Sequence, residues 1–219
     1  LGPGVNIYRT PLNGRNFEYM GEDPHLASVM AVPYIQGVQE KGVAACLKHF
    51  VLNNQEQWRF TINADIRDRA LHEIYLPPYK AAVEKGGVWS IMTAYNKFRG
   101  RYCSHNELLL NTILKHDWQF DGAVISDWGA VHNTREAALF GLDIEMGTNP
   151  PGIPASAGNI YDHYYLAGPF RTLIENGDID ESAVDEKVRR ILRLMLRTGM
   201  NRSRPPGRMN SREHLDTAR

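Results

Sequence analysis

The fold is decided by the stretch Gly122-Ala123-Val124-Ile125-Ser126-Asp127-Trp128-Gly129. Its short apolar run, Ala123-Val124-Ile125, is typical of a fully buried strand. A carboxylate, Asp127, and an indole, Trp128, follow at the end of this strand. A carboxylate in such a position can attack or stabilise a cationic sugar carbon, and an indole can cover the apolar face of a sugar. The same residues also fit a second interpretation, in which Asp127 caps the next helix and Trp128 packs in the core.

Four more apolar runs alternate with segments of helical period along the chain. With 123–125, they predict strands at residues 5–8, 43–47, 88–92 and 142–146. The segments of helical period are 24–41, 67–85, 106–116, 130–140, 161–176 and 181–197. Two adjacent prolines, Pro77 and Pro78, predict a kink or break in the second of these helices. Strands that alternate with helices imply helical crossovers, and therefore a parallel sheet.

This order of elements predicts an α/β fold, and two architectures fit it. A closed (β/α)8 barrel of the TIM type takes about 250 residues, which is more than the 219 of this chain. We therefore expect most of a TIM-like barrel, incomplete at its N-terminal end. A doubly wound open sheet is the alternative, although no strand is followed by the Gly-x-Gly-x-x-Gly turn typical of dinucleotide-binding sheets.

Two regions are expected along the chain. Residues 1–200 form the partial barrel domain, and residues 201–219 form a linker, stiffened by Pro205-Pro206, that leads toward a second domain. The sequence begins Leu1-Gly2-Pro3-Gly4, with no Met and no signal-peptide pattern. We therefore expect that the start has been removed or that the chain is a piece of a larger polypeptide, and its N-terminus does not indicate where the protein is located.

The composition excludes several classes of function. Lys and Arg number 25, as do Asp and Glu, so the formal net charge is zero, and we expect neither nucleic acid nor an anionic membrane as a partner. The apolar runs are too short to span a bilayer. The two cysteines, Cys46 and Cys103, are far apart and have no metal-ligand spacing, which predicts buried thiols. We expect no metal and no cofactor. The sequence lacks the Gly-x-Ser-x-Gly motif of serine hydrolases, so we do not expect an enzyme of that class.

Polar or aromatic residues follow the predicted strands at several ends. In a parallel barrel the working residues lie where strands end and the following loops begin. The ends in this chain bring Arg9 with Arg15, Lys48-His49, Met92 with Tyr95, Asp127-Trp128, and Asp143 with Glu145. So many polar and aromatic residues at one rim of the predicted barrel favour an active site over a chance arrangement.

The Lys48-His49 pair fits two roles. It can clamp two vicinal hydroxyls, or it can consist of an ion-pairing lysine and a core histidine. The polar loop 53–56 can likewise orient the site or form a solvated turn.

Taken together and in order, these segments resemble glycoside hydrolase family 3, of the β-glucosidase and β-xylosidase type. The resemblance covers nearly the whole chain. It is carried by residues 1–9, Gly14-Arg15-Asn16-Phe17-Glu18, 21–24, 48–56, 91–96, 120–128, 141–146 and the helical segment 188–192.

The resemblance implies a set of site residues. Asp127 is then the catalytic nucleophile of the barrel domain, and Trp128 shapes the +1 side of the pocket. The residues implied to bind or line the sugar site are Arg15, Lys48, His49, Met92 and Tyr95.

The resemblance also implies a retaining mechanism. Asp127 attacks the anomeric carbon to form a covalent glycosyl-enzyme, while a second carboxylic acid protonates the leaving oxygen and later activates water. That acid/base is implied to belong to a missing α/β sandwich domain after the linker, and a sugar-binding Asp to a missing segment before Leu1. Glu18, Glu56 and Glu145 are expected to support the site or to pair with Arg or Lys.

The function expected from the resemblance is hydrolysis of terminal non-reducing β-D-glucosyl residues. The expected partners are a β-linked oligosaccharide or glycoside, the missing N-terminal segment and the missing C-terminal domain. The alternatives are a β-xylosidase, another exo-glycosidase of the family, or a non-catalytic sugar-binding or structural fragment when the chain stands alone. The resemblance favours a periplasmic or secreted location.

Overall fold

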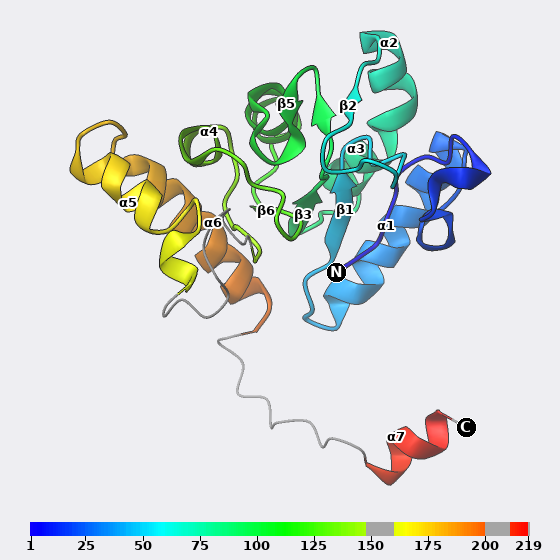
Figure 1. The fold of residues 1–219 in the computed structure, drawn as a ribbon. Helices are drawn as coiled ribbons and strands as arrows, with labels where there is room; N and C mark the ends of the chain where they lie inside the picture. Colours follow the sequence, from blue (N-terminus) through cyan, green and yellow to red (C-terminus); the bar gives the residue numbers. More distant parts are fainter. Residues whose placement is uncertain (148–159, 200–210, 219) are drawn as a thin grey trace.

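A three-stranded parallel sheet is the centre of the structure, a computed structural model that describes residues 1–147, 160–199 and 211–218. Its strands, in the order β1-β3-β6, are β1 (Cys46–Phe50), β3 (Ser90–Thr93) and β6 (Ala123–Ile125) (Figure 1). The predicted strand at 123–125 and the parallel arrangement are confirmed. In register, Ser90 lies between Cys46 and Ala123.

Two further extended segments join the sheet by single parallel bridges. Gly4 bridges Lys48 on one side, and Ile144 bridges Ile125 on the other. The strand predicted at 142–146 is thus reduced to one bridge, at Ile144. The strand predicted at 5–8 lies earlier than expected: the bridge is at Gly4, and Val5 donates a backbone hydrogen bond to the carbonyl oxygen of Lys48 at 2.9 Å. The strand predicted at 43–47 begins later, because Val43 is 56 % exposed just after the end of the preceding helix.

Close packing explains why residue 122, just before β6, is a glycine. A Cβ at Gly122 would lie 2.3 Å from the carbonyl oxygen of Trp89 and 2.6 Å from the ring of Phe120. The backbone can enter β6 at this point only without a side chain.

The helices of the first half of the chain pack beside β1. Helix α1 (Pro24–Glu40) agrees with the prediction and is capped by Asp23, whose side chain accepts a hydrogen bond from the backbone N–H of His25 at 2.7 Å. The predicted helix 67–85 is divided into three parts: α2 (Asp68–Ala70), a π-helical turn (Leu71–Tyr75) and α3 (Pro77–Glu84). The break falls at Pro77, as expected for a residue without a backbone N–H.

The second half of the chain is mostly helical. The π-helix η5 (Leu108–Asp117) and α4 (Thr134–Leu139) flank β6 in sequence. They are followed by η6 (Ile160–His163), α5 (Gly168–Glu175), α6 (Ser182–Arg197) and α7 (Arg212–Thr217). Arg190 of α6 donates to the carbonyl oxygens of Phe120 and Gly122 at 2.8 and 2.9 Å, which ties this helix to the start of β6.

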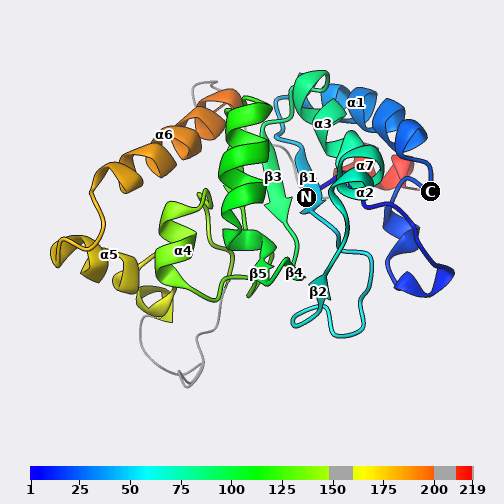
Figure 2. The same cartoon turned by 90° about the horizontal axis from the view of Figure 1, so that it is seen from above.

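A second, smaller sheet was not predicted. It consists of β2 (Asn63–Ala64), β4 (Lys97–Phe98) and β5 (Arg101–Tyr102), and two of these strands follow the ends of β1 and β3 in the chain. In Figure 2, α1, α3 and α6 lie at the top, toward the starts of the parallel strands, and the small sheet lies at the bottom, beyond the ends of these strands. The short helices η1 (Pro11–Asn13), η2 (Asn16–Glu18) and η4 (Cys103–His105) complete the described elements.

The main core lies between the parallel sheet and its helices. Phe50 is fully buried, with its ring centroid 5.1 Å from that of Tyr79 and 6.0 Å from that of Trp118. Cys46 and Cys103 are free, buried thiols, as predicted. Over the described residues, no helix combines the length and apolar character needed to cross a membrane.

The two sheets support the predicted α/β class but do not show a closed barrel. The α/β class is confirmed, but in the described part of the chain both sheets are small and neither closes on itself. Closure into a barrel therefore remains a prediction.

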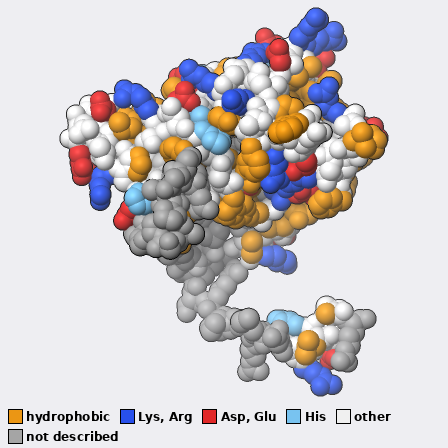
Figure 3. All heavy atoms as spheres, viewed as in Figure 1, with side chains coloured by type: hydrophobic (Ala, Val, Ile, Leu, Met, Phe, Trp, Pro, Cys, Tyr) orange, Lys and Arg blue, Asp and Glu red, His pale blue; other side chains and the backbone are white. Residues whose placement is uncertain are grey.

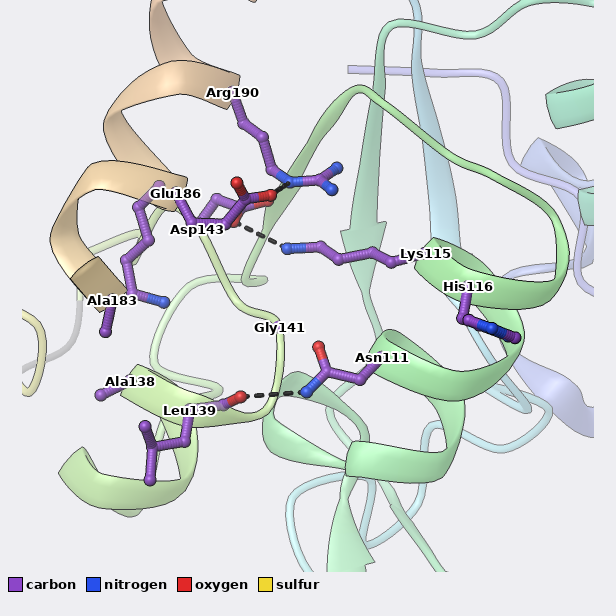
Figure 4. A pocket seen from close by; sticks show the side chains of 11 residues that line it. Asn111, Lys115, His116, Ala138, Leu139, Gly141, Asp143, Ala183, Glu186 and Arg190 are labelled. Carbon is purple, nitrogen blue, oxygen red and sulfur yellow. Dashed lines mark hydrogen bonds and ion pairs between the residues drawn. The ribbon is translucent and has the colours of Figure 1, made fainter. Parts of the chain in front are cut away.

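Contrary to the prediction from the sequence, Asp143 does not lie at the rim where the strands end. Instead of joining the rim, it accepts hydrogen bonds from the Lys115 ammonium at 2.9 Å and the Val124 backbone N–H at 2.8 Å. Figure 4 shows Lys115 reaching it from η5, in a pocket also lined by Glu186 and Arg190 of α6. The residue after Asp143 makes the bridge to β6, so Asp143 belongs to the strand region itself and faces the outer helices.

Candidate active site

The site lies where the parallel strands end. Lys48 and His49 are in the last part of β1, Tyr95 follows β3, and Asp127 follows β6. Hydrogen bonding keeps these ends together: the backbone N–H of Ala94 donates to the carbonyl oxygen of Phe50 at 2.8 Å. The carboxyl ends of parallel strands meet at one edge, which explains why residues so distant in sequence are neighbours here.

Asp127 is a buried carboxylate, only 5 % exposed. Its Oδ1 accepts a hydrogen bond from the backbone N–H of Trp128 at 2.8 Å, and its side chain is also hydrogen-bonded to Tyr95. Burial raises the pKa of the Asp127 carboxyl above its usual value. These two hydrogen bonds and the positive charges of Arg15 and Arg59 oppose that rise, because they stabilise the ionised form.

His49 is a core histidine that also faces the nucleophile candidate. Its Nε2 lies 3.5 Å from Oδ2 of Asp127, and its Nδ1 lies 3.1 Å from the Tyr19 hydroxyl. Its backbone is held by Asn6, whose Oδ1 accepts from the His49 N–H at 2.8 Å. Burial, with the nearby cations Arg15, Lys48 and Arg59, lowers the pKa of His49 to about 2. The imidazole is therefore neutral at the edge of the site.

Two glutamates neutralise the cations around Asp127. Glu18 forms ion pairs with Arg15 and, at 3.0 Å, with Lys48. Although burial opposes it, these two cations lower the pKa of Glu18. Glu56 lies 3.8 Å from Arg15 and 2.6 Å from Arg59. The pairing of these glutamates with Arg and Lys agrees with the expectation.

The third glutamate has a different role. Glu145 accepts a hydrogen bond from the backbone N–H of Leu166 at 2.7 Å, and so supports the chain beyond the sheet.

Tyr95 contacts Arg59, a residue that no sequence motif indicated. The guanidinium carbon of Arg59 lies 4.6 Å from the centre of the Tyr95 ring and 4.9 Å from that of Phe60. The Tyr95 and Phe60 rings also meet edge to face, with centroids 4.6 Å apart. Burial and the neighbouring Asp127 raise the pKa of Tyr95, so its hydroxyl stays protonated and can donate to the carboxylate.

Trp128 and Met92 lie in contrasting surroundings. The Trp128 side chain is 48 % exposed, and the backbone of Gly147 packs against its indole. Met92 is buried with Cys46 and Ile125 in a small apolar cluster inside the sheet. Trp128 is thus accessible at the surface, whereas Met92 supports the strands beneath the site. Figure 3 shows hydrophobic side chains mixed with charges of both signs on the face seen in Figure 1.

Among the described residues, the site has one carboxylate without a Lys or Arg ion pair, together with several hydrogen-bond donors that can bind hydroxyl groups. Within the described residues, Asp127 has no ion pair with Lys or Arg, while Glu18 and Glu56 do. The described residues contain no group of three or more His, Cys, Asp or Glu side chains that could hold a metal ion. The chemistry that fits is attack by Asp127 on an electrophilic carbon of a bound, hydroxyl-rich ligand, or stabilisation of positive charge on that carbon.

Comparison with known proteins places the chain among the glycoside hydrolases. Its residues 1–194 match the sequence model of the glycosyl hydrolase family 3 N-terminal domain, and the chain belongs to this family. β-Glucosidase BoGH3A of Bacteroides ovatus is 60 % identical over 218 residues, which cover 100 % of this chain and 29 % of that protein. An exo-α-(1→6)-L-arabinopyranosidase of Bifidobacterium longum is 49 % identical over 146 residues, covering 67 % of this chain and 19 % of that protein.

A solved structure shows the same fold. β-Glucosidase 3B of Thermotoga neapolitana, in complex with α-D-glucose, matches with a TM-score of 0.85 and 38 % identity, over 100 % of this chain and 30 % of that chain. This chain therefore spans less than a third of the length of each of these three proteins.

Proposed function

We propose that the chain is the nucleophile-bearing part of a retaining β-glucosidase, which removes terminal non-reducing β-D-glucosyl residues. The observation that carries the proposal is the state of Asp127: a buried carboxylate at the carboxyl edge of a parallel sheet, without a Lys or Arg ion pair among the described residues. Its hydrogen bonds to Trp128 and Tyr95 hold one orientation. The similarity to BoGH3A and to a glucose-bound β-glucosidase supports glucose as the sugar.

In this proposal Asp127 attacks the anomeric carbon as the leaving oxygen takes a proton from a general acid. The C–O bond to the leaving group breaks, and a covalent glycosyl-enzyme forms with inverted configuration at that carbon. Water, activated by the same acid/base group, then releases the sugar with a second inversion, so that the configuration is retained overall. The cations Arg15 and Arg59 favour the ionised carboxylate that this attack requires.

The other predicted residues hold the sugar. Arg15 and Lys48 already share Glu18, which fixes the direction of their donors, and the neutral His49 presents its ring beside Asp127. We propose that these three bind sugar hydroxyls. Trp128, which is half exposed, then covers the +1 side of the pocket. Tyr95 and Met92 line the inner wall, Tyr95 by direct contact with Asp127 and Met92 from the strand below.

The acid/base is proposed to come from outside this chain. A general acid needs a raised pKa, whereas the pKa of Glu18 is lowered by Arg15 and Lys48, and Glu56 is paired with Arg59. We propose that residues 1–200 are part of a (β/α)8 barrel completed by a preceding segment. Residues 201–219 then lead to an α/β sandwich domain that carries the acid/base. The unclosed sheet and the partial coverage of the relatives support this division.

A second candidate function is a glycosidase for a pentopyranose. The 49 % identity to an exo-α-(1→6)-L-arabinopyranosidase supports it, and a β-xylosidase belongs to the same group because xylose also lacks C6. If the chain acts alone, a non-catalytic sugar-binding or structural role is the remaining alternative.

The test uses the complete enzyme with aryl β-D-glucoside, β-D-xyloside and α-L-arabinopyranoside. A β-glucosidase has its highest kcat/KM on the glucoside and releases β-glucose first, as seen by NMR. A 2-deoxy-2-fluoro-β-D-glucosyl fluoride should label Asp127, as seen by peptide mass spectrometry. Labelling of another residue would reject the nucleophile, and preference for a pentoside would select the second candidate.

A further inference from the structure

Arg59 occupies a central place in the site that no motif indicated. It follows a turn in which its backbone N–H donates to the carbonyl oxygen of Glu56 at 3.2 Å. From there its side chain returns to Glu56, with Nη1 2.6 Å from Oε2. The same guanidinium lies over the rings of Tyr95 and Phe60, at 4.6 and 4.9 Å from their centroids. One partly buried side chain thus satisfies a carboxylate and contacts two aromatic rings.

These contacts join two halves of the site. On one side, Tyr95 is hydrogen-bonded to Asp127. On the other side, Glu56 lies 3.8 Å from Arg15, and Arg15 lies 3.1 Å from His49. A planar guanidinium suits this position because it can pair with a carboxylate in its plane while an aromatic ring contacts its face.

We propose that Arg59 is a positioning residue of the glycosidase reaction, which clamps Tyr95 against Asp127 and fixes Glu56 beside Arg15. This inference rests on the proposed function. Arg59 itself need not touch the substrate. It acts through the orientation of the Tyr95 hydroxyl and through its positive charge near the carboxylate.

The positive charge of Arg59 affects the pKa of Asp127, which an uncharged side chain in the same place would not do. The groups facing Asp127 are His49 from β1, Tyr95 after β3, the Trp128 N–H, Arg15 and Arg59, with the Cys46 thiol also within electrostatic range. Burial raises the pKa of Asp127, and Arg59 is one of the two cations that oppose the rise. Loss of Arg59 should therefore raise this pKa further and protonate the nucleophile at a higher pH.

The experiment compares Arg59→Met with Arg59→Lys in the complete enzyme, on an aryl β-D-glucoside. Methionine keeps much of the length and the contact with the rings but removes the charge. We expect kcat/KM at neutral pH to fall about 10- to 100-fold. The acid limb of the pH profile of kcat/KM, which reports the free enzyme, should move to higher pH. Lysine should return the acid limb toward the wild-type position but recover only part of the rate, because an ammonium cannot reproduce the planar stack.

Arg99 offers a matched control. Its guanidinium pairs with Asp68 and lies 4.8 Å from the centre of the Phe98 ring, which is the same combination of a carboxylate and an aromatic ring. Arg99→Met should leave the acid limb and kcat/KM within about twofold of wild type.

Two results would overturn the inference about Arg59. One is an unchanged acid limb in Arg59→Met, and the other is a loss of activity that only matches a loss of folded protein. If Arg59→Met does not fold, Arg59→Lys decides: a wild-type rate there would show that the planar stack does not matter. Failure of the proposed function has a distinct signature, since wild-type enzyme would then not be labelled at Asp127 by the fluorosugar. In that case the inference falls with it.

Discussion

Nη2 of Arg15 lies 3.1 Å from Nε2 of His49. A guanidinium can only donate hydrogen bonds, so Nε2 accepts and the proton of the neutral imidazole is on Nδ1. Nδ1 can then donate to the Tyr19 hydroxyl, 3.1 Å away, which also accepts from Asn53 at 3.2 Å. In this tautomer His49 offers no proton to Asp127, and the pair is not a catalytic dyad. Without a sugar, His49 therefore holds Arg15 in place beside the carboxylate. In the proposed sugar complex, the Nε2 lone pair accepts from a sugar hydroxyl in place of Arg15.

The first prediction follows from the low pKa of His49. Burial and the nearby cations lower this pKa to about 2, below the ordinary value of about 6.5. The unfolded chain therefore binds more protons below pH 6.5, so the stabilising contribution is complete above that pH and is lost as the pH falls. One such group costs about 2 kcal/mol between pH 6.5 and pH 5.

The measurement is chemical unfolding of wild type and His49→Gln at pH 7.5 and pH 5. The destabilisation caused by the substitution should be smaller at pH 5, because the variant no longer has to exclude that proton. His116→Gln serves as control, since the side chain of His116 is 81 % exposed. An equal effect of His49→Gln at both pH values would contradict the neutral, buried imidazole.

The second prediction concerns the stability cost of Asp127, the proposed nucleophile. The folded-state pKa of Asp127 is raised, chiefly by burial, so the carboxyl favours folding when it is protonated and this contribution is lost as the pH rises. Asp127→Asn should therefore raise the thermal unfolding midpoint at pH 7 while it abolishes turnover, and the gain should shrink toward pH 3. Differential scanning fluorimetry at the two pH values measures it. A lower midpoint for the variant at pH 7 would show that the ionised carboxylate stabilises the fold.

Much of the fold was predictable because its signals are local. The strand at Ala123–Ile125 is an apolar run ended by polar residues, and the break at Pro77 follows from a missing N–H. The small sheet was not predictable, since β2 and β4 are two residues long and too short for any periodicity.

The candidate site was predictable at strand ends and unpredictable in loops. Asp127 and Tyr95 follow strands and meet as expected. Asp143 was misplaced because polarity alone does not show whether a residue ends a strand or belongs to it. Arg59 was missed because its role depends on a turn that folds it back over Tyr95, and nothing in a polar loop sequence indicates that direction.

The third prediction uses the contact between Gly147 and Trp128. A Cβ at Gly147 would lie 2.8 Å from Cδ1 of the indole, well inside the normal separation of about 3.5–4.0 Å. Gly147→Ala should displace the ring and lower kcat/KM for aryl glucosides by roughly tenfold, equivalent to about 1.4 kcal/mol, with a shift in tryptophan fluorescence. At Gly129 the backbone has φ +72° and a Cβ would meet nothing within 4 Å. Gly129→Ala therefore tests backbone strain without the collision, and an equal loss in both variants would mean that strain alone acts.

The last prediction separates buried from exposed ion pairs. Asp143 is buried between Lys115, which it contacts at 2.9 Å, and Lys187, whose pKa is lowered by burial to about 8. Asp143→Ala leaves two ammonium groups in a low-polarity space and an unpaired Val124 N–H, so it should cost about 3–5 kcal/mol. Glu73→Ala, which breaks the exposed pair with Arg69, should cost at most about 1 kcal/mol.

A double variant distinguishes the cost of an unpaired charge from the loss of a favourable contact. Lys115→Met combined with Asp143→Leu removes both charges of the Lys115–Asp143 pair shown in Figure 4. If the cost of Asp143→Ala arises from stranded ammonium groups, the double variant should unfold at a higher temperature than Asp143→Ala. An equal or lower unfolding temperature of the double variant would show that the stranded Lys115 charge is not the main cost. The lost hydrogen bond from the Val124 N–H, which both variants lack, would then account for the destabilisation.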